Sequence, residues 1–422
     1  MHLVRRLWYG ESRLIVIRGE IREKMSEANK KIKIEKILFN VLWLGYLFIT
    51  LILFYNQAAS TQGRLGTFHT DMVDYLEFLF AGERDRYTYA YPIVFNLIVF
   101  FSKFTTPAAA AAFAVTLINC LTPIIIKYYL DQFVGKDKGI LNCFLTFILL
   151  FVTPIFFGVI NCNMYLGVWS PNTWHNAPIL ATKGISIIAF FSFFTLLQTY
   201  KTKIEKKDFF LFTVSMLLSV LAKPTFAFVF FPTVGLYLLY ELIASKFKII
   251  KRSLLFFVAF VPSFIALLYQ YWIMFDESGN NKIVFGLGTV WHLLVNNLPF
   301  AILCGLAFPL FVAVFNYKYF SKSVIYRITG FFVIVSIAEA YFISEAGDRM
   351  LHGNFMWGYC HALFFAFLIS LILFVRTFRQ KNMFYRIGGT LLISAHLISG
   401  IIWFIYQFLG RPYNNIVLSL LG

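Results

Sequence analysis

Charged residues are what this sequence has least of. Only 14% of its 422 residues are charged, and 20 acidic residues stand against 37 lysines and arginines. Hydrophobic residues make up 59% of the chain, and the mean hydropathy is +0.73. Soluble globular domains carry about 25% charged residues. The composition therefore predicts a membrane protein and excludes a soluble domain of ordinary size.

Cysteine is also scarce, and the few cysteines follow no functional pattern. They are Cys120, Cys143, Cys162, Cys304 and Cys360. Their spacing matches neither a metal site nor a disulfide framework, and most lie in apolar segments, where cysteine behaves as a small apolar side chain. The net charge of +17 would suggest nucleic acid for a soluble protein. Here its distribution along the chain predicts membrane orientation instead, so we expect no nucleic-acid partner.

The distribution of basic residues divides the chain in two. Residues 1–36 form a basic segment that we expect in the cytoplasm, and residues 37–422 form one integral membrane domain. Apolar runs near the crossing length of about 20 residues predict an all-α polytopic protein with about eleven transmembrane helices. The predicted spans are 37–56, 107–130, 139–160, 184–200, a pair within 209–241, 253–273, 298–316, 328–344, 358–376 and 387–409. This topology places the unusual polar residues on the outer face of a cytoplasmic (inner) membrane.

One apolar stretch, residues 209–241, has basic loops on both sides and must therefore turn back on itself. Its length of about 33 residues is too short for two full crossings at about 20 residues each. Only Lys223, Pro224 and Thr225 interrupt it. We therefore expect two short or tilted helices that meet at Lys223 and Pro224, and an indentation of the outer face where a lipid-borne head group could enter.

The loop between the first two spans, residues 57–106, holds an acid-rich amphipathic segment. Wound as a helix, residues 70–80 separate into two faces. The apolar face comprises Met72, Val73, Leu76, Leu79 and Phe80, and the polar face comprises Asp71, Asp74 and Tyr75. Such a helix lies along a membrane surface. A second apolar piece, residues 91–104, is too short to span and is expected on the same surface.

Candidate site residues come from four external segments. They are His69, Asp71, Asp74 and Arg84; Trp174, His175, Asn176 and Lys183; Lys223; and Glu345, Arg349, His352 and Asn354. An enzyme on the outer face has no free nucleotides, so an activated sugar would have to arrive on a lipid. Glycosyl transfer from a polyprenyl phosphate needs a carboxylate to take the acceptor proton and cations to hold the departing phosphate.

These needs assign the roles. Asp71 is the expected general base, with Asp74 as its substitute, and each could instead be an ordinary surface carboxylate. The expected donor-phosphate contacts are Arg349, Lys183, His175 and Lys223. The expected substrate contacts are His69, Asp74, Arg84, Trp174, Asn176, Glu345, His352 and Asn354. A divalent metal is not favoured, because His69 and Asp71 alone do not make a metal site.

The arrangement resembles the C-type (GT-C) superfamily of integral membrane glycosyltransferases, in which an acid in the first extracytoplasmic loop serves as base. Here HTDMVDY supplies the acid, and YAYPIVFNLIVFFSKF is similar to a surface helix that precedes the second span. SVLAKPTFAFVFFP and GDRMLHGNFMWGY look like segments of bacterial members. The first loop lacks the DxD pair of the metal-dependent branch. The resemblance implies inverting transfer of a sugar from a polyprenyl-phosphate donor, among membrane lipids, to an acceptor glycan, lipid or protein, with cell-envelope polysaccharide as one destination.

Two other function classes stay open from the sequence. A polysaccharide polymerase also has many spans, but its large polar loop would typically come in the middle or late chain. A lipid-linked-sugar flippase or transporter would place charged residues deep in several spans, and beyond Lys223 and Glu339 we find few.

Overall fold

The computed structural model describes residues 2–60, 68, 70–82, 84–161, 169–274 and 282–410, with side chains from residue 29 onward apart from positions 321, 348, 349 and 351. The first half contains α1 (His2–Ala59), α2 (Met72–Ala81), α3 (Arg84–Ala90), α4 (Pro92–Phe101), α5 (Pro107–Asn119), α6 (Leu121–Phe133), η1 (Lys136–Lys138), α7 (Gly139–Phe151) and α9 (Ala177–Thr199). The middle contains α10 (Lys206–Ala222), α11 (Thr225–Ala244), α12 (Ile250–Val258), α13 (Val261–Met274), β1 (Ile283–Phe285) and α14 (Thr289–Leu294). The last part contains α15 (Leu298–Phe315), α16 (Tyr317–Lys322), α17 (Val324–Phe342), β2 (Ile343–Glu345), η2 (Gly347–His352), η3 (Asn354–Met356), α18 (Trp357–Thr377), η4 (Phe378–Gln380) and α19 (Met383–Phe408).

By helix length and hydropathy, the chain is a multi-pass membrane protein. Among the described residues, eight helices are long and apolar enough to cross a membrane, or nine if the bent pair α12–α13 is one span. We expected about eleven. The difference comes from α7, which has 13 residues, and α10, which has 17. At about 1.5 Å per residue, α7 is about 20 Å long, which is less than the hydrocarbon core of about 30 Å.

Several helices begin with a residue whose side chain caps the first turn. Thr106, Asn176, Asn297 and Asn382 each accept a hydrogen bond from a backbone N–H in the first turn of α5, α9, α15 and α19. These residues satisfy donors that a helix leaves unpaired at its start. These caps stabilise the starts of four apolar helices.

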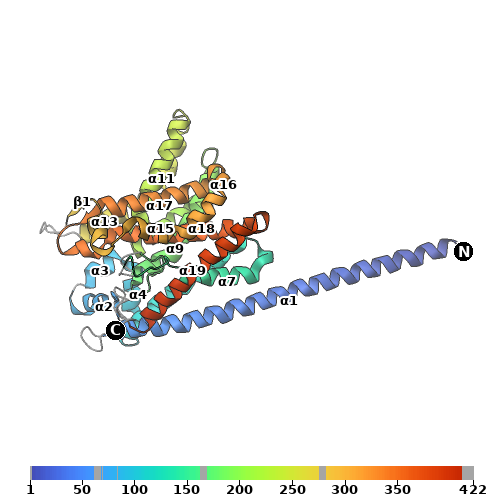
Figure 1. The fold of residues 1–422 in the computed structure, drawn as a ribbon, viewed down its shortest axis with the longest axis horizontal. Coiled ribbons are helices and arrows are strands. Elements are labelled where there is room, and N and C mark those ends of the chain that lie inside the picture. The colour runs from blue at the N-terminus through green and yellow to red at the C-terminus, as the bar shows by residue number, and fades with distance from the viewer. Residues whose placement is uncertain are drawn as a thin grey trace.

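Two helices form the centre of the bundle. In the most apolar 18-residue stretch of the α18 span, 94% of the residues are buried within the protein, and the corresponding share in α9 is 83%. The corresponding share for α1 is only 22%, and Figure 1 shows α1 extending well beyond the rest of the molecule. Polar side chains on α9 or at its ends are therefore inside the protein, where they must find partners.

The segment between α1 and α5 folds into the short helices α2, α3 and α4, which gather at one end of the molecule (Figure 1). Met72 and Leu79 of α2 are buried, as the amphipathic pattern predicts, whereas Phe80 is exposed. The chain also forms a two-stranded antiparallel sheet that we had not predicted, in which Ile283 of β1 pairs with Glu345 of β2. This sheet lies at the same end and fixes the position of Glu345.

Candidate functional site

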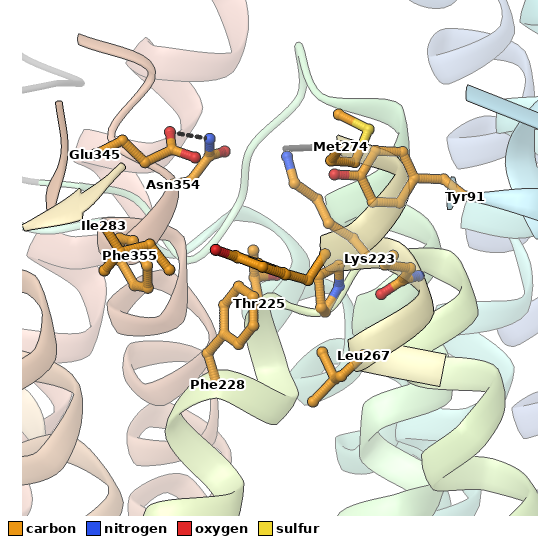
Figure 2. Close-up of a pocket in the computed structure, with 13 residues that line it drawn as sticks. Tyr91, Lys223, Thr225, Phe228, Leu267, Met274, Ile283, Glu345, Asn354 and Phe355 are labelled. Atoms are coloured by element: carbon orange, nitrogen blue, oxygen red, sulfur yellow. Dashed lines mark hydrogen bonds between the residues drawn. The ribbon is translucent and has the colours of Figure 1, made fainter. Parts of the chain in front are cut away.

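A cavity of about 110 Å³ lies where the α10–α11 junction meets α13, β1 and the segment after β2 (Figure 2). Its walls are mostly apolar and aromatic. They are formed by Tyr91, Lys223, Pro224, Thr225, Phe228, Leu267, Gln270, Tyr271, Met274, Ile283, Glu345, Asn354 and Phe355. Charged groups enter it from two sides. An apolar cavity with a few convergent polar groups is the usual form of a small-molecule site.

Lys223 supplies the cation, and a break between two helices puts it there. α10 ends at Ala222 and α11 begins at Thr225, as the interruption of the apolar stretch predicted. Lys223 itself is extended, with φ −166° and ψ 135°, and Pro224 then starts the next helix. The lysine is only 6% exposed, and its Nζ lies 5.2 Å from the ring centroid of Trp357. A buried ammonium over an indole face is favourably placed, and it attracts anions.

Asn176 connects this lysine to the first loop. Its Oδ1 caps α9 by accepting from the N–H of Ile179 at 3.1 Å and lies 3.5 Å from the Lys223 Nζ. Its Nδ2 donates to Asp71 Oδ2 at 2.5 Å and to the Tyr75 hydroxyl at 3.2 Å. One amide therefore links the carboxylate to the ammonium. We call Asp71, Asn176 and Lys223 the polar row.

Asp71 sits at the N-cap position of α2 and is half-buried. Its N–H donates to the carbonyl of His175 at 3.3 Å, and the Thr70 hydroxyl donates to the same carbonyl at 3.1 Å. The Tyr75 hydroxyl is 3.5 Å from Asp71 Oδ2. Burial, and next the Asp71 charge, raise the pKa of Tyr75 well above its usual value, so this phenol stays protonated beside the carboxylate.

The backbone carbonyl of His175 accepts the hydrogen bond from Asp71, and the His175 ring lies near enough for the Asp71 charge to affect its pKa. The ring is buried beside Trp357, with 5.8 Å between the ring centroids. Burial lowers the pKa of His175, the Asp71 charge opposes that shift, and Lys223 adds to it. The imidazole is therefore neutral at neutral pH, so it could meet a phosphate as a hydrogen-bonding group but not as a cation.

A second carboxylate enters the cavity from the opposite side. Glu345 at the end of β2 is 4% exposed, and its Oε2 accepts from the Asn354 Nδ2 at 2.6 Å. Figure 2 shows this pair across the cavity from Lys223 and Tyr91. The site thus holds two carboxylates: Asp71, which Asn176 links to Lys223, and Glu345, in the cavity wall across from Lys223.

The structure does not bring every predicted residue to the cavity. Lys183 is buried in α9, donates to Asn172 Oδ1 at 2.7 Å and lies over the ring of Phe364. Trp174 is 1% exposed and packs against Tyr46, with 6.1 Å between centroids, so it has no free face for stacking on a sugar.

Three other predicted residues do not line the cavity, and two more lie outside what the structure describes. Arg84 and His352 are exposed and Asp74 is half-buried, and none of the three lines a described cavity. His69 and the side chain of Arg349 lie outside the described residues.

Several residues of the cavity wall were not predicted from the sequence. Gln270 of α13 donates from Nε2 to the carbonyls of Ala90 at 2.6 Å and Val220 at 2.8 Å, and so joins three helices at the cavity. A lone amide in an apolar helix is a usable signal, because an unpaired amide is costly there. Tyr91 and Met274 gave no such signal, since aromatic and thioether side chains are common at membrane surfaces and in cores.

An apolar groove adjoins the cavity. It has a volume of about 340 Å³, lies between α11 and α17, and shares Phe228 and Phe355 with the cavity walls. Glu339 of α17 lines it and is 8% exposed. The groove can receive an apolar chain whose polar end occupies the cavity.

Within the described ranges, no three His, Cys, Asp or Glu side chains lie close enough to hold a metal ion. No protein-family model matches this chain, and no curated protein matches it in sequence. The chemistry of the site has to be argued from its own groups.

Proposed function

We propose that this protein is a membrane glycosyltransferase of GT-C-like architecture, which moves a sugar from a polyprenyl-phosphate donor to an acceptor glycan, lipid or protein. The observation that carries the proposal is the polar row, in which Asn176 joins the Asp71 carboxylate to the buried Lys223 beside an apolar cavity. Such a transfer needs a general base and a cation that binds phosphate, and Asp71 and Lys223 are groups of these two kinds.

In the proposed reaction, Asp71 accepts the proton of the acceptor hydroxyl. The acceptor oxygen then forms a bond to the anomeric carbon, and the bond from that carbon to the phosphate oxygen breaks, with inversion. The electron pair leaves on the lipid phosphate, whose negative charge Lys223 would stabilise. Asn176 holds the base in position through its Nδ2, and Tyr75 adds a second hydrogen bond to the same carboxylate.

The groove between α11 and α17 supports a lipid-borne donor. Its lining is apolar apart from Glu339, and it shares two phenylalanines with the cavity. A prenyl chain could lie in the groove while its phosphate reached Lys223. Burial of apolar chain there would contribute about 25 cal/mol per Å² of area removed from water.

The decisive experiment compares wild type with Asp71→Asn in purified form, with labelled polyprenyl-phosphate sugars and membrane lipid extract. We expect Asp71→Asn to bind donor as wild type does and to transfer about 10²- to 10⁴-fold more slowly, because the general base is lost. Donor binding is measured separately from transfer. Asp85→Asn, an exposed carboxylate of α3, is the matched control.

Glu345→Gln distinguishes the two carboxylates. If Asp71→Asn transfers normally and Glu345→Gln does not, the base is the carboxylate in the cavity wall. If both variants transfer as wild type does, neither carboxylate is the base. If wild type itself transfers no sugar from these donors, the transferase proposal fails, and the polymerase and flippase alternatives come to the front.

A further inference from the structure

A larger cavity, of about 470 Å³, lies at the opposite end of the helices that form the proposed site. Three helices establish this placement. The cavity involves the last turns of α9, the second half of α11 and the first turn of α17, whereas Asn176, Thr225 and Glu345 mark the other ends of these helices. The two cavities are therefore separate.

The lining of this second cavity is divided into a polar and an apolar part. The polar residues are Thr195, Gln198, Tyr200, Lys201, Tyr237, Glu241 and Ser323, and the apolar residues are Phe133, Phe191, Phe194, Leu197, Val324 and Ile325. A water-filled crevice would not need the three phenylalanines, and a purely apolar chain would leave the polar side unmatched. The lining fits an amphiphile with a compact polar head.

One polar group in the lining lacks a partner. The Tyr200 hydroxyl is buried and makes no hydrogen bond within the described part of the chain. Its neighbours are engaged, since the Tyr237 hydroxyl donates to Glu241 Oε1 at 3.1 Å and Lys201 forms an ion pair with the same carboxylate. Buried hydroxyls are nearly always hydrogen-bonded, so the free phenol indicates a missing acceptor.

The surroundings of the cavity are positively charged. The basic residues that follow α9 or lie on α16 and α17 are Lys201, Lys203, Lys206, Lys207, Lys318, Lys322 and Arg327. The acidic residues nearby are Glu205, Asp208 and Glu241, and Glu205 forms an ion pair with Lys203. Cations exceed anions, and basic pockets between membrane helices bind anionic lipid head groups.

We propose that this cavity binds an anionic glycerophospholipid. Its phosphate accepts hydrogen bonds from the Tyr200 hydroxyl and the Lys201 ammonium, and one acyl chain lies against Phe133, Phe191 and Phe194. The site is independent of glycosyl transfer, since it shares no residue with the polar row or the cavity beside it.

The test measures lipid binding to the delipidated full chain by native mass spectrometry, with phosphatidylglycerol, phosphatidylethanolamine and phosphatidylcholine of identical acyl chains. We expect one phosphatidylglycerol per chain, held about tenfold more tightly than the other two lipids, because the ammonium of their head groups offsets the phosphate charge and is repelled by the surrounding lysines. Lys201→Gln should lower that affinity about tenfold and reduce the preference for phosphatidylglycerol, because it removes a cation. Tyr200→Phe should lower the affinity for all three lipids about threefold, because each of them has the phosphate that accepts from this hydroxyl.

Lys251→Ala is the matched control, because Lys251 is an exposed basic residue of α12 outside the described cavity walls. It should bind phosphatidylglycerol as wild type does. Tyr200→Phe removes only an oxygen, so it keeps the test valid if Lys201→Gln folds poorly. Equal binding of the three lipids, or unchanged phosphatidylglycerol affinity in Tyr200→Phe and Lys201→Gln, would overturn the proposal and leave only unspecific lipid contact. Tighter binding of phosphatidylethanolamine would overturn it as well.

Discussion

Asn176 is the residue on which the geometry of the candidate site depends most. Its Oδ1 caps α9, and its Nδ2 holds Asp71, so its amide orientation is determined by partners on both sides. A change at this position therefore has two separable effects, one on helix α9 and one on the carboxylate.

Asn176→Ser and Asn176→Ala separate these effects. Serine caps a helix nearly as well as asparagine but is too short to hold Asp71, whereas alanine does neither. We expect Asn176→Ala to be about 1 kcal/mol less stable than Asn176→Ser, while both lose transfer to the same degree. Thermal unfolding in detergent measures the first quantity and a transfer assay the second. Equal stability of the two variants would mean that the cap contributes little, and normal transfer in Asn176→Ser would remove Asn176 from the site.

His175 predicts a pH dependence of stability. Its pKa in the folded protein lies below the usual value of 6.5, mainly through burial. The unfolded chain therefore binds a proton that the folded chain does not, and stability falls as the pH drops through 6.5 towards the folded pKa. We expect acidification to destabilise wild type more than His175→Gln. His352→Gln, a change at an exposed histidine, should behave as wild type does. If His175→Gln and wild type lose the same stability on acidification, the ring is not held neutral.

The positions of several polar residues were predictable from the sequence where they depended on residue type and rough topology. Asp71, Asn176, Lys223 and Glu345 all reach the polar row or the cavity from loops and a helix break that hydropathy reveals. Trp174 and Lys183 were also expected there, yet they point into the core. Which way a side chain turns in a loop of mixed polarity depends on contacts with distant helices, and no local pattern contains that information.

At the scale of elements, hydropathy located the helices better than it counted the spans. The break at Lys223 and Pro224 followed directly from the sequence and is confirmed. The span 139–160 was predicted too long because the apolar run continues past Phe151. In the structure α7 ends at Phe151, and the chain that follows is non-helical and hydrogen-bonds to α19. The pairing of β1 with β2 joins segments about 60 positions apart, a separation that strand propensity alone cannot bridge.

The contact between α19 and the end of α7 is tight enough to test. At Gly400 of α19, a Cβ atom would overlap the carbonyl oxygen of Phe151. We expect Gly400→Ala to destabilise the protein by about 1 to 3 kcal/mol, because a backbone atom cannot move aside as a side chain can. Gly45→Ala on α1 is the control, since no atom lies within 4 Å of its added Cβ. Thermal unfolding of both variants measures the difference, and equal midpoints would contradict this packing.

For the whole molecule, the arrangement places two chemically different ends on one helical bundle. The polar row and its cavity lie with α2, α3, α4 and the small sheet, and the basic residues after α9 and on α16 lie at the other end. If these ends face opposite sides of a membrane, as the basic loops predict, the site is extracytoplasmic.

Cysteine labelling in intact cells tests this orientation. In a background without native cysteines, we expect Arg84→Cys to react with an impermeant maleimide from outside. Lys203→Cys should react only after the membrane is opened, and both positions are exposed in the structure. Labelling of both from the outside, or of Lys203→Cys alone, would contradict the predicted topology and the extracytoplasmic site.

The three members of the polar row share a feature that bears on ancestry. Asp71 and Asn176 are N-caps and Lys223 is a C-cap, so each lies at the first position outside a helix. The positions are 105 and 47 residues apart, so the fold brings together three helix ends from separate parts of the sequence. Distant relatives would then be recognisable by an acid, an amide and a lysine in that order at helix boundaries, long after their apolar segments had ceased to resemble one another.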